Sequence, residues 1–242
     1  MGKNANREGS YHMLLQCRNI TYRYPHGDAL VFDDLHCRLA DPGFHGLFGP
    51  SGVGKSTLAR IIAGEISDFS GEITPPDSAG ILYSCNTERL PGWSSVGDHL
   101  TKVTPAARLP LLQELITAFD LTSCIDSRFS QLSLGQKNRA NLTRYLLQDF
   151  DLLIMDESLA NVDEATRKQI IVTIKKMFPD KYFLYISHSV AEVSTFCARI
   201  LVLRDFHKAP QLIEVAGRDH HGDSAMDRTA LERTMLEIVN AA

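Results

Sequence analysis

A stretch of nine residues, 49–57, constrains the fold of this chain more than any other. It holds the spacing G-x-x-x-x-G-K-[ST], in which glycines let the backbone form a loop tight enough to aim successive N–H groups at a phosphate. The lysine adds a point charge, and the following hydroxyl is a ligand for Mg²⁺. The pattern therefore predicts a site for a nucleoside triphosphate. The loop residues are Gly49, Pro50, Ser51, Gly52, Val53, Gly54, Lys55, Ser56 and Thr57.

The sequence on either side of this loop supports the prediction. Residues 44–48 are typical of a short buried strand, and residues 58–63 of a helix that Gly64 would end. A loop that runs into a helix N-terminus favours anions, because the first backbone N–H groups of the helix have no partner within it. The strand and the helix make a chance match of the motif improbable.

The rest of the chain predicts an α/β fold: a P-loop NTPase core with a mainly parallel sheet, an N-terminal antiparallel β subdomain and an inserted helical subdomain. Residues 22–28 are expected to form a turn, and residues 1–12 a disordered leader. We expect one domain over 13–242, with the core and β subdomain in 13–84 and 146–204, the helical part in 85–145 and a final strand and helix in 205–242. Strands are predicted at 14–21, 35–39, 71–74, 80–83, 151–155, 182–186, 200–203 and 212–215, and helices at 106–119, 137–147, 164–177, 189–196 and 227–239.

Charge and cysteine content exclude several classes of protein. The net charge of −4, from 25 basic and 29 acidic residues, gives no support for a protein that binds nucleic acid by bulk charge. The five cysteines are scattered without a C-x-x-C pair, which indicates reduced thiols in a cytosolic protein rather than a zinc site. No apolar run approaches the length that spans a bilayer, and the polar start of the chain is not a signal peptide.

Two adjacent carboxylates, Asp156 and Glu157, follow the four apolar residues 152–155. Ligands of parallel α/β sheets bind at the carboxyl ends of the strands, so both acids are expected at the triphosphate. Asp156 would hold Mg²⁺, and Glu157 would orient or deprotonate the attacking water. The structural alternative is that both acids cap the segment that follows.

Three further positions are candidates for the same site. Asp163 lies six residues beyond Glu157, and His188 follows the strand predicted at 182–186, from which it can reach the γ-phosphate or organise the water. Ser133, in the run 132–136, is a plausible helix N-cap, and the hydroxyl and N–H groups there could instead form a second anion site.

Taken in order, Tyr24, the loop 49–57, the run 132–136, the run 152–157, Asp163 and His188 resemble an ATP-binding subunit of an ABC transporter. The resemblance extends over residues 14–204. It implies that Tyr24 stacks on adenine, that Lys55, Glu157 and His188 are catalytic, and that Ser56 and Asp156 hold Mg²⁺. It also implies that Ser133 and Gly135 of the signature motif contact the γ-phosphate held by a second subunit, so that two ATP molecules lie in a head-to-tail dimer. Gln136 and Asp163, which closes the D-loop, are expected to bind nucleotide as well.

Within that family, residues 90–96 are similar to a stretch of the importers for nitrate, sulfonates and taurine. The resemblance implies a homo- or heterodimer on the cytoplasmic face of a membrane, attached through a separate permease, with a possible solute-binding protein and no nucleic acid. The function expected from it is ATP hydrolysis that drives solute transport, with import favoured.

The chain departs from the family pattern at two important positions. The glutamine expected at the end of the strand 80–83 is replaced by Ser84 or Cys85, of which only Ser84 offers an oxygen ligand. Leu134 replaces a signature glycine and adds bulk beside the γ-phosphate. Two milder changes are Ser158 after the catalytic glutamate and Asn161 before Asp163. We therefore predict good ATP affinity with slow or partner-dependent hydrolysis.

Other functions remain open on the sequence alone. A soluble ABC-type ATPase outside transport and a non-hydrolysing regulatory module are the alternatives, and the changes at Ser84 and Leu134 favour the second. A GTPase is disfavoured because no N-K-x-D motif occurs, and a small-molecule kinase would not explain residues 132–136. The transported solute is not encoded in this chain, because specificity belongs to the permease.

Overall fold

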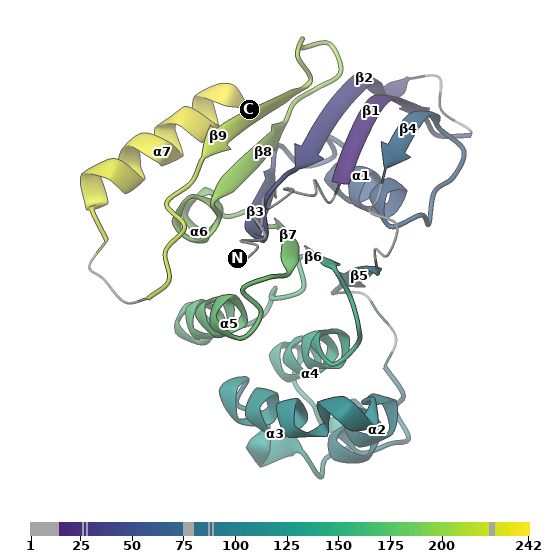
Figure 1. Cartoon of the computed structure of the whole chain (residues 1–242), viewed down its shortest axis with the longest axis vertical. Coiled ribbons are helices and arrows are strands. Elements are labelled where there is room, and N and C mark those ends of the chain that lie inside the picture. The colour runs from purple at the N-terminus through teal and green to yellow at the C-terminus, as the bar shows by residue number, and fades with distance from the viewer. Residues whose placement is uncertain are drawn as a thin grey trace, which may run out of the picture.

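Two β-sheets of different kinds form the body of the molecule (Figure 1). The computed structural model describes residues 15–25, 27, 29–74, 80–86, 88, 90–222 and 226–242. The predicted leader at 1–12 lies outside these described residues. One sheet has six strands and the other has three, and the helices lie around the larger sheet.

The six-stranded sheet has the order β5-β6-β7-β3-β8-β9 and is parallel except for the last pair, which confirms the predicted mainly parallel core. Cys85 is paired with Asp156, and Asp156 with Ile186, so the carboxyl ends of β5, β6 and β7 lie along one edge. The strands are β3 (Gly43–Phe48), β5 (Ile81–Cys85), β6 (Leu152–Asp156), β7 (Tyr182–Ile186), β8 (Arg199–Leu203) and β9 (Leu212–Ala216).

The central strands are apolar because both faces of the sheet are covered. Every residue of β6 and β7 is buried, as parallel strands between two layers require. Alternate residues point to opposite faces, so Leu153 and Met155 pack in one hydrophobic core and Leu152 and Ile154 in the other. β6 runs one residue further than predicted, and Asp156 is its last residue.

The three-stranded sheet is antiparallel, in the order β2-β1-β4, and confirms the predicted antiparallel sheet near the N-terminus. The prediction that residues 22–28 form a turn is wrong at its start, because Tyr22 and Arg23 are paired with Phe32 and Leu30. His26 and Asp28 of that turn lie outside the described residues. The strands are β1 (Leu15–Arg23), β2 (Leu30–Leu39) and β4 (Ser70–Thr74).

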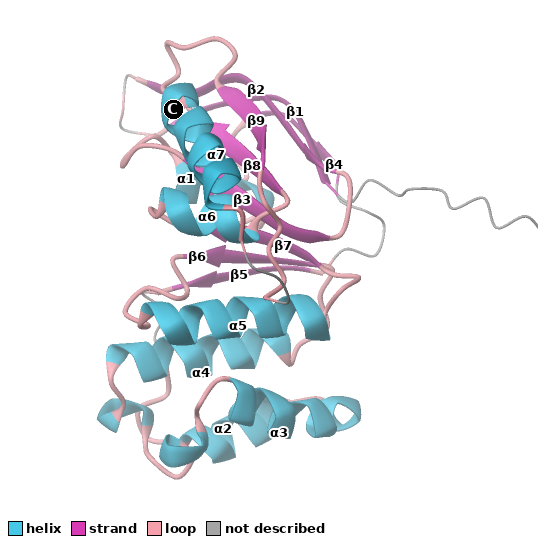
Figure 2. Ribbon diagram, turned by 90° about the vertical axis from the view of Figure 1, so that its left-hand side faces the viewer, coloured by secondary structure: helices cyan, strands magenta, loops and turns pink. Residues whose placement is uncertain are grey.

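Helices complete the two cores. Figure 2 shows α4 and α5 along the strands β5 and β6, with α2 and α3 beyond α4. On the other face, α1 packs with residues of β1 and β2 in the second core.

The helix predicted at 106–119 is shorter than expected and follows a 3-10 turn at Ala106–Arg108, and α2 was not predicted as a separate helix. The helices are α1 (Lys55–Ile62), α2 (Val96–Val103), α3 (Leu109–Ala118), α4 (Leu134–Leu146), α5 (Glu164–Met177), α6 (Val190–Phe196) and α7 (Arg228–Ala241).

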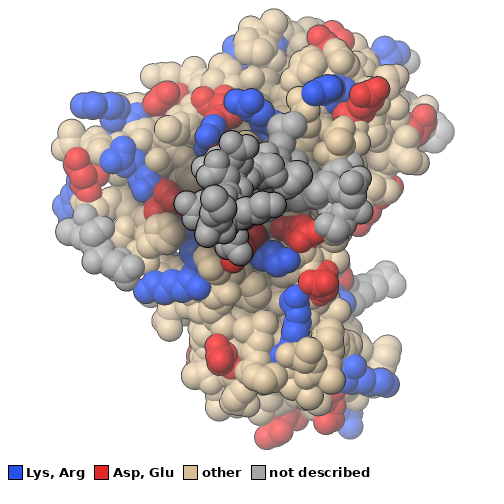
Figure 3. Space-filling view, viewed as in Figure 1, with Lys and Arg blue, Asp and Glu red and all other residues tan. Residues whose placement is uncertain are grey.

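The surface carries charges of both signs. Figure 3 shows basic and acidic side chains interspersed over the face that it presents. Within the described ranges, no helix has the length and apolar character needed to cross a bilayer.

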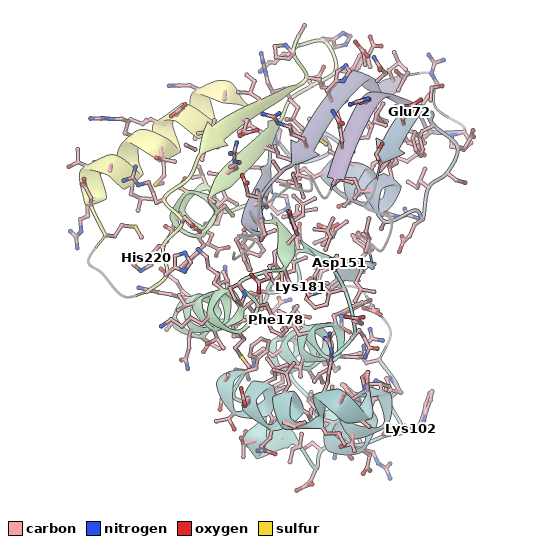
Figure 4. All side chains as sticks on the ribbon, viewed as in Figure 1. Glu72, Lys102, Asp151, Phe178, Lys181 and His220 are labelled. Carbon is pink, nitrogen blue, oxygen red and sulfur yellow. The ribbon has the colours of Figure 1, made fainter. Side chains whose placement is uncertain are left out.

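A single carboxylate joins the amino ends of β5, β6 and β7. Asp151 accepts a hydrogen bond from the Gly80 backbone N–H at 3.3 Å and lies 3.2 Å from the Lys181 Nζ. Figure 4 shows Asp151 and Lys181 close together beside the sheet. This contact fixes the relative positions of three strands whose opposite ends carry the residues considered below.

We expect Asp151→Ala to lower the free energy of unfolding by about 1 kcal/mol, because it removes one hydrogen bond and a partly exposed ion pair. Denaturant titration of the purified chain measures the effect. The exposed Asp180, replaced by alanine, is the control and should change stability by less than about 0.5 kcal/mol. Equal stability of the two variants would show that the Asp151 contact does not hold the strands.

Candidate functional site

Residues 49–54 connect β3 to α1, and the order of strand, loop and helix is as predicted. The helix begins at Lys55, three residues before its predicted start. Gly52 and Gly54 have φ angles of 78° and 109°, which favour glycine. A Cβ on Gly54 would lie 2.8 Å from the Val31 Cγ1, so a larger residue there would press on side chains of β2. Helix α1 has no side-chain cap at its N-terminus, which leaves its first N–H groups directed at the loop. The loop therefore has the shape of an anion cradle.

Lys55 closes this loop. Its Nζ donates hydrogen bonds to the carbonyl oxygens of Gly49 and Pro50, at 2.8 and 2.9 Å, and its side chain is buried. Burial lowers the pKa of Lys55, and the charges of Glu157 and Asp156 oppose that shift. The ammonium group is therefore held inside the cradle, facing two carboxylates.

Tyr24 lies against the helix that follows the loop. Its hydroxyl forms a hydrogen bond with the Thr57 hydroxyl, and its ring meets that of Tyr22 edge to face at 5.3 Å. The Tyr24 side chain is 48% exposed, which leaves ring surface accessible to a ligand. The structure thus brings Tyr24 to the cradle from a different sheet.

The two carboxylates stand at the carboxyl edge of the core sheet. Asp156 is buried, and its Oδ2 accepts a hydrogen bond from the Tyr83 hydroxyl at 2.8 Å. Burial, and next this hydrogen bond, raise the pKa of the Tyr83 hydroxyl, which therefore stays a donor. Glu157 has a left-handed backbone with φ 51°, and its N–H donates to the Ile186 carbonyl.

Both oxygens of Glu157 are occupied by side chains from neighbouring strand ends. The His188 Nε2 lies 2.5 Å from Oε1, and the Asn86 Nδ2 donates to Oε2 at 3.2 Å. His188 follows β7, where Ser187 is fixed by a hydrogen bond of 2.8 Å to the Glu192 Oε2. The structure therefore brings the predicted residues Glu157 and His188 together, and it adds Asn86, which the sequence had not singled out.

Ser84 lies away from this group. It is fully buried, and its hydroxyl and carbonyl oxygens both accept hydrogen bonds from the Ser158 hydroxyl, at 3.0 and 2.9 Å. It does not line the cavity in front of Asp156, whereas Cys85 does. Of the two residues that stand where the family pattern expects a glutamine, Ser84 is therefore bonded to Ser158, and Cys85 faces the cavity.

The cavity in front of the carboxylates has a volume of about 540 Å³. The Ser56 hydroxyl and the Asp156 carboxylate line it, and these hard oxygens are the ligands that Mg²⁺ prefers. Glu157, Tyr83 and Asn86 line it as well. The donor set and the adjoining cradle therefore fit a magnesium-bound phosphate group.

The residues 133–136 form a helix start elsewhere on the surface. The Ser133 hydroxyl accepts from the Gln136 N–H at 3.2 Å, and the Gln136 side chain accepts from the Ser133 N–H at 2.9 Å, which confirms the predicted N-cap. Gly135 packs so closely on the Asn161 carbonyl that a Cβ would lie 2.5 Å away. Leu134 is 62% exposed, and Ser133 and Gly135 do not line the cavity of Asp156.

Asp163 is the N-cap of α5. Its Oδ1 accepts a hydrogen bond from the Thr166 N–H at 3.0 Å, and the hydrogen bonds from Thr166 lower the pKa of this carboxyl. Asp163 is exposed and does not line the cavity of Asp156. The described part of the chain thus carries two separate groups, one around Lys55 and Asp156 and one around Ser133 and Gly135.

Comparison with known proteins gives a consistent family. The profile described as "ABC transporter" matches residues 32–160. The chain is 31% identical over 184 residues to the molybdenum import ATP-binding protein ModC of Brucella abortus (strain 2308), which covers 68% of this chain and 51% of the relative. It is 29% identical over 194 residues to the maltose/maltodextrin import ATP-binding protein MalK of Yersinia pestis bv. Antiqua (strain Antiqua), covering 73% and 53%. The chain thus spans about half the length of these curated relatives.

Solved structures show the same fold. An inward-facing conformation of a putative metal-chelate type ABC transporter superposes with a TM-score of 0.69 at 17% identity, covering 93% of this chain and 89% of that one. A bacterial Atm1-family ABC exporter with ATP bound superposes with a TM-score of 0.72 at 17% identity, covering 95% and 41%.

Proposed function

The chain belongs to the ABC transporter family, and we propose that it is an ATP-binding subunit which binds and hydrolyses MgATP at a head-to-tail dimer interface. One observation carries the proposal. The Ser56 hydroxyl, next in sequence to Lys55 of the glycine-rich loop, and the carboxylates of Asp156 and Glu157 border one cavity at the carboxyl edge of a parallel sheet. That edge is where ligands of α/β sheets bind.

In this proposal the residues around the cradle bind the substrate. The backbone N–H groups of residues 49–57, apart from Pro50, which has none, surround the phosphates. Lys55 meets the β- and γ-phosphates with the third N–H of its ammonium group, while the carbonyls of Gly49 and Pro50 accept the other two. The Ser56 hydroxyl and the Asp156 carboxylate would hold Mg²⁺, which would neutralise phosphate charge when bound. The exposed ring of Tyr24 stacks on adenine.

Glu157 and His188 act on the attacking water. The water oxygen attacks the γ-phosphorus, its proton passes to Glu157, and the bond to the bridging oxygen breaks to leave ADP and phosphate. His188 lies within hydrogen-bond distance of Glu157 and orients it. The separate group of Ser133, Gly135, Gln136 and Asp163 is proposed to meet the γ-phosphate bound to a second subunit, which supports a dimer as the active form.

The proposed partners follow from the family. The relatives ModC and MalK are named import ATP-binding proteins, which supports import through a separate transmembrane permease, on the cytoplasmic face of a membrane. A solute-binding protein is a further possible partner, and nucleic acid is not. The division into a core, a helical part and a C-terminal strand and helix stays part of the proposal.

A second candidate is a nucleotide-binding module that does not hydrolyse ATP. Two departures from the family pattern favour it: the exposed Leu134 at the start of α4, and the missing glutamine at Ser84 or Cys85. Hydrolysis by the wild-type chain decides between the two candidates.

The dimer is tested by light scattering of the chain with MgATP and with ATP plus EDTA. We expect a weak dimer with MgATP only, and we expect Leu134→Gly to lower its dissociation constant about tenfold, which is 1.4 kcal/mol. The reason is that the leucine side chain adds bulk where a second subunit's phosphate must approach the backbone.

Leu109 provides a matched control, because it is also an exposed leucine at the first residue of a helix. Leu109→Gly should leave the dimer constant unchanged. A chain that binds no MgATP at all would contradict the proposed function, and unaltered dimerisation of Leu134→Gly would place Leu134 outside the interface.

A further inference from the structure

The carboxylate of Glu157 has a second partner that neither the sequence pattern nor the family resemblance assigns. The Asn86 Nδ2 donates a hydrogen bond of 3.2 Å to Oε2, while His188 contacts Oε1. Asn86 is exposed and follows directly after the last residue of β5. Of the described residues that line this cavity, it is the only one with an amide side chain.

Strand register explains why Asn86 reaches this position. Cys85 and Asp156 are the last residues of their strands and are paired with each other. One further step along each chain brings residue 86 opposite Glu157. The contact therefore depends on the pairing of β5 with β6, and a sequence pattern within either segment could not reveal it.

Glu88, two residues beyond Asn86, is bound to side chains of α4. Glu88 accepts a hydrogen bond from the Asn141 Nδ2 at 2.9 Å and two from the Tyr145 hydroxyl, also at 2.9 Å. It also forms an ion pair with Arg144. Burial, and next the Glu88 hydrogen bond, raise the pKa of Tyr145, so its hydroxyl remains a donor to Glu88. Asn86 thus lies between Cys85, which is paired with β6, and Glu88, which is bonded to α4.

An amide suits this place because it donates through nitrogen and accepts through oxygen, and neither function depends on pH. A carboxylate that must receive a proton from water works only within narrow limits of position. We propose that Asn86 is a positioning residue: its amide fixes Glu157 for the attack of water on ATP. The proposal rests on the proposed ATPase function. It also explains how the site can work without the glutamine of the family pattern, since Asn86 supplies an amide side chain beside Glu157.

The test compares three variants at Asn86. Asn86→Asp has the same shape but no donor, and it places a second negative charge beside Glu157. We expect kcat for ATP hydrolysis to fall about 10- to 100-fold in Asn86→Asp and Asn86→Ala. In Asn86→Ala the dissociation constant of MgATP should change less than about twofold, since the hydrogen bond of Asn86 goes to Glu157 and not to the loop 49–57. Asn86→Gln, which keeps the amide, should retain at least about a third of kcat.

A second readout does not depend on hydrolysis. The side-chain NH₂ signals of Asn86 in a ¹⁵N spectrum of the nucleotide-free chain are assigned by their absence in Asn86→Asp. They should shift in Glu157→Gln and stay in place in Glu72→Gln. Asn240, an exposed residue of α7, gives the matched control, and Asn240→Asp should leave kcat and melting temperature unchanged.

The outcomes separate the two proposals. Absence of hydrolysis by the wild-type chain contradicts the ATPase function, and the NMR shift then still decides whether Asn86 contacts Glu157. Hydrolysis by the wild type with an equal kcat in Asn86→Asp overturns the positioning role. A loss of melting temperature in Asn86→Ala that Asn86→Gln does not share, with kcat unchanged, would assign Asn86 a structural role only.

Discussion

Replacing Lys55 by alanine is expected to weaken the binding of MgATP at least about 100-fold, or 2.7 kcal/mol. The Lys55 ammonium is the cation inside the phosphate cradle, and its two hydrogen bonds to the Gly49 and Pro50 carbonyls hold it there. A ligand with several negative charges loses its principal cation when that group is removed. Isothermal titration with MgATP measures the loss.

The control is Lys102, an exposed residue of α2 that Figure 4 shows far from the core sheet. Lys102→Ala removes the same net charge and should leave the dissociation constant within about twofold. Melting curves of both variants test whether the cradle itself has collapsed. Equal affinity of Lys55→Ala and the wild-type chain would exclude the loop 49–57 as the phosphate site.

Glu157→Gln is expected to reduce kcat for ATP hydrolysis about 1,000-fold, because an amide cannot accept the proton of the attacking water. The amide keeps the shape of the side chain, so MgATP affinity should be preserved within about threefold. The dimer with MgATP should last longer in this variant, since hydrolysis no longer dissociates it. Phosphate release and light scattering measure the two effects.

Glu72 of β4 is the matched control, because Glu72→Gln makes the same chemical change at an exposed position away from the carboxyl edge of the core sheet (Figure 4). It should hydrolyse ATP at the wild-type rate. A wild-type chain that is already as slow as Glu157→Gln would refute the ATPase function and leave a nucleotide-binding module.

Local chemistry made much of the fold predictable. The glycines of the loop 49–57 fix its path, because β-carbons on Gly49 and Gly54 would not fit and Gly52 has a positive φ. The loop, the strand before it and the helix after it could therefore be inferred together. The position of the carboxylates at the end of β6 was also predictable from local sequence. An apolar run is typical of a buried parallel strand, and ligands bind at the carboxyl ends of such strands, where the two acids follow. The N-cap role of Ser133 is local in the same way, because its partner in the two capping hydrogen bonds is Gln136, three residues further on.

Features that depend on pairing between distant segments were not predictable. Asn86 stands opposite Glu157 only because β5 pairs with β6. Tyr22 and Arg23 directly precede residues typical of a turn and were therefore assigned to it. In the structure β2 begins early enough in the sequence to pair with both of them. The start of α2 depends partly on the Val96 N–H, which donates to the Ser127 carbonyl 31 residues away. In each case the partner, and not the local residue type, decides the structure.

The position of Lys55 has a kinetic consequence. Because the loop carbonyls of Gly49 and Pro50 hold the ammonium group, the cradle has its shape before a ligand arrives. A preformed loop loses little conformational entropy on binding, so ordering should not slow the approach of a nucleotide. Association should then follow single-exponential kinetics with a rate that rises linearly with nucleotide concentration, and differences in affinity among nucleotides should arise mainly in their dissociation rates.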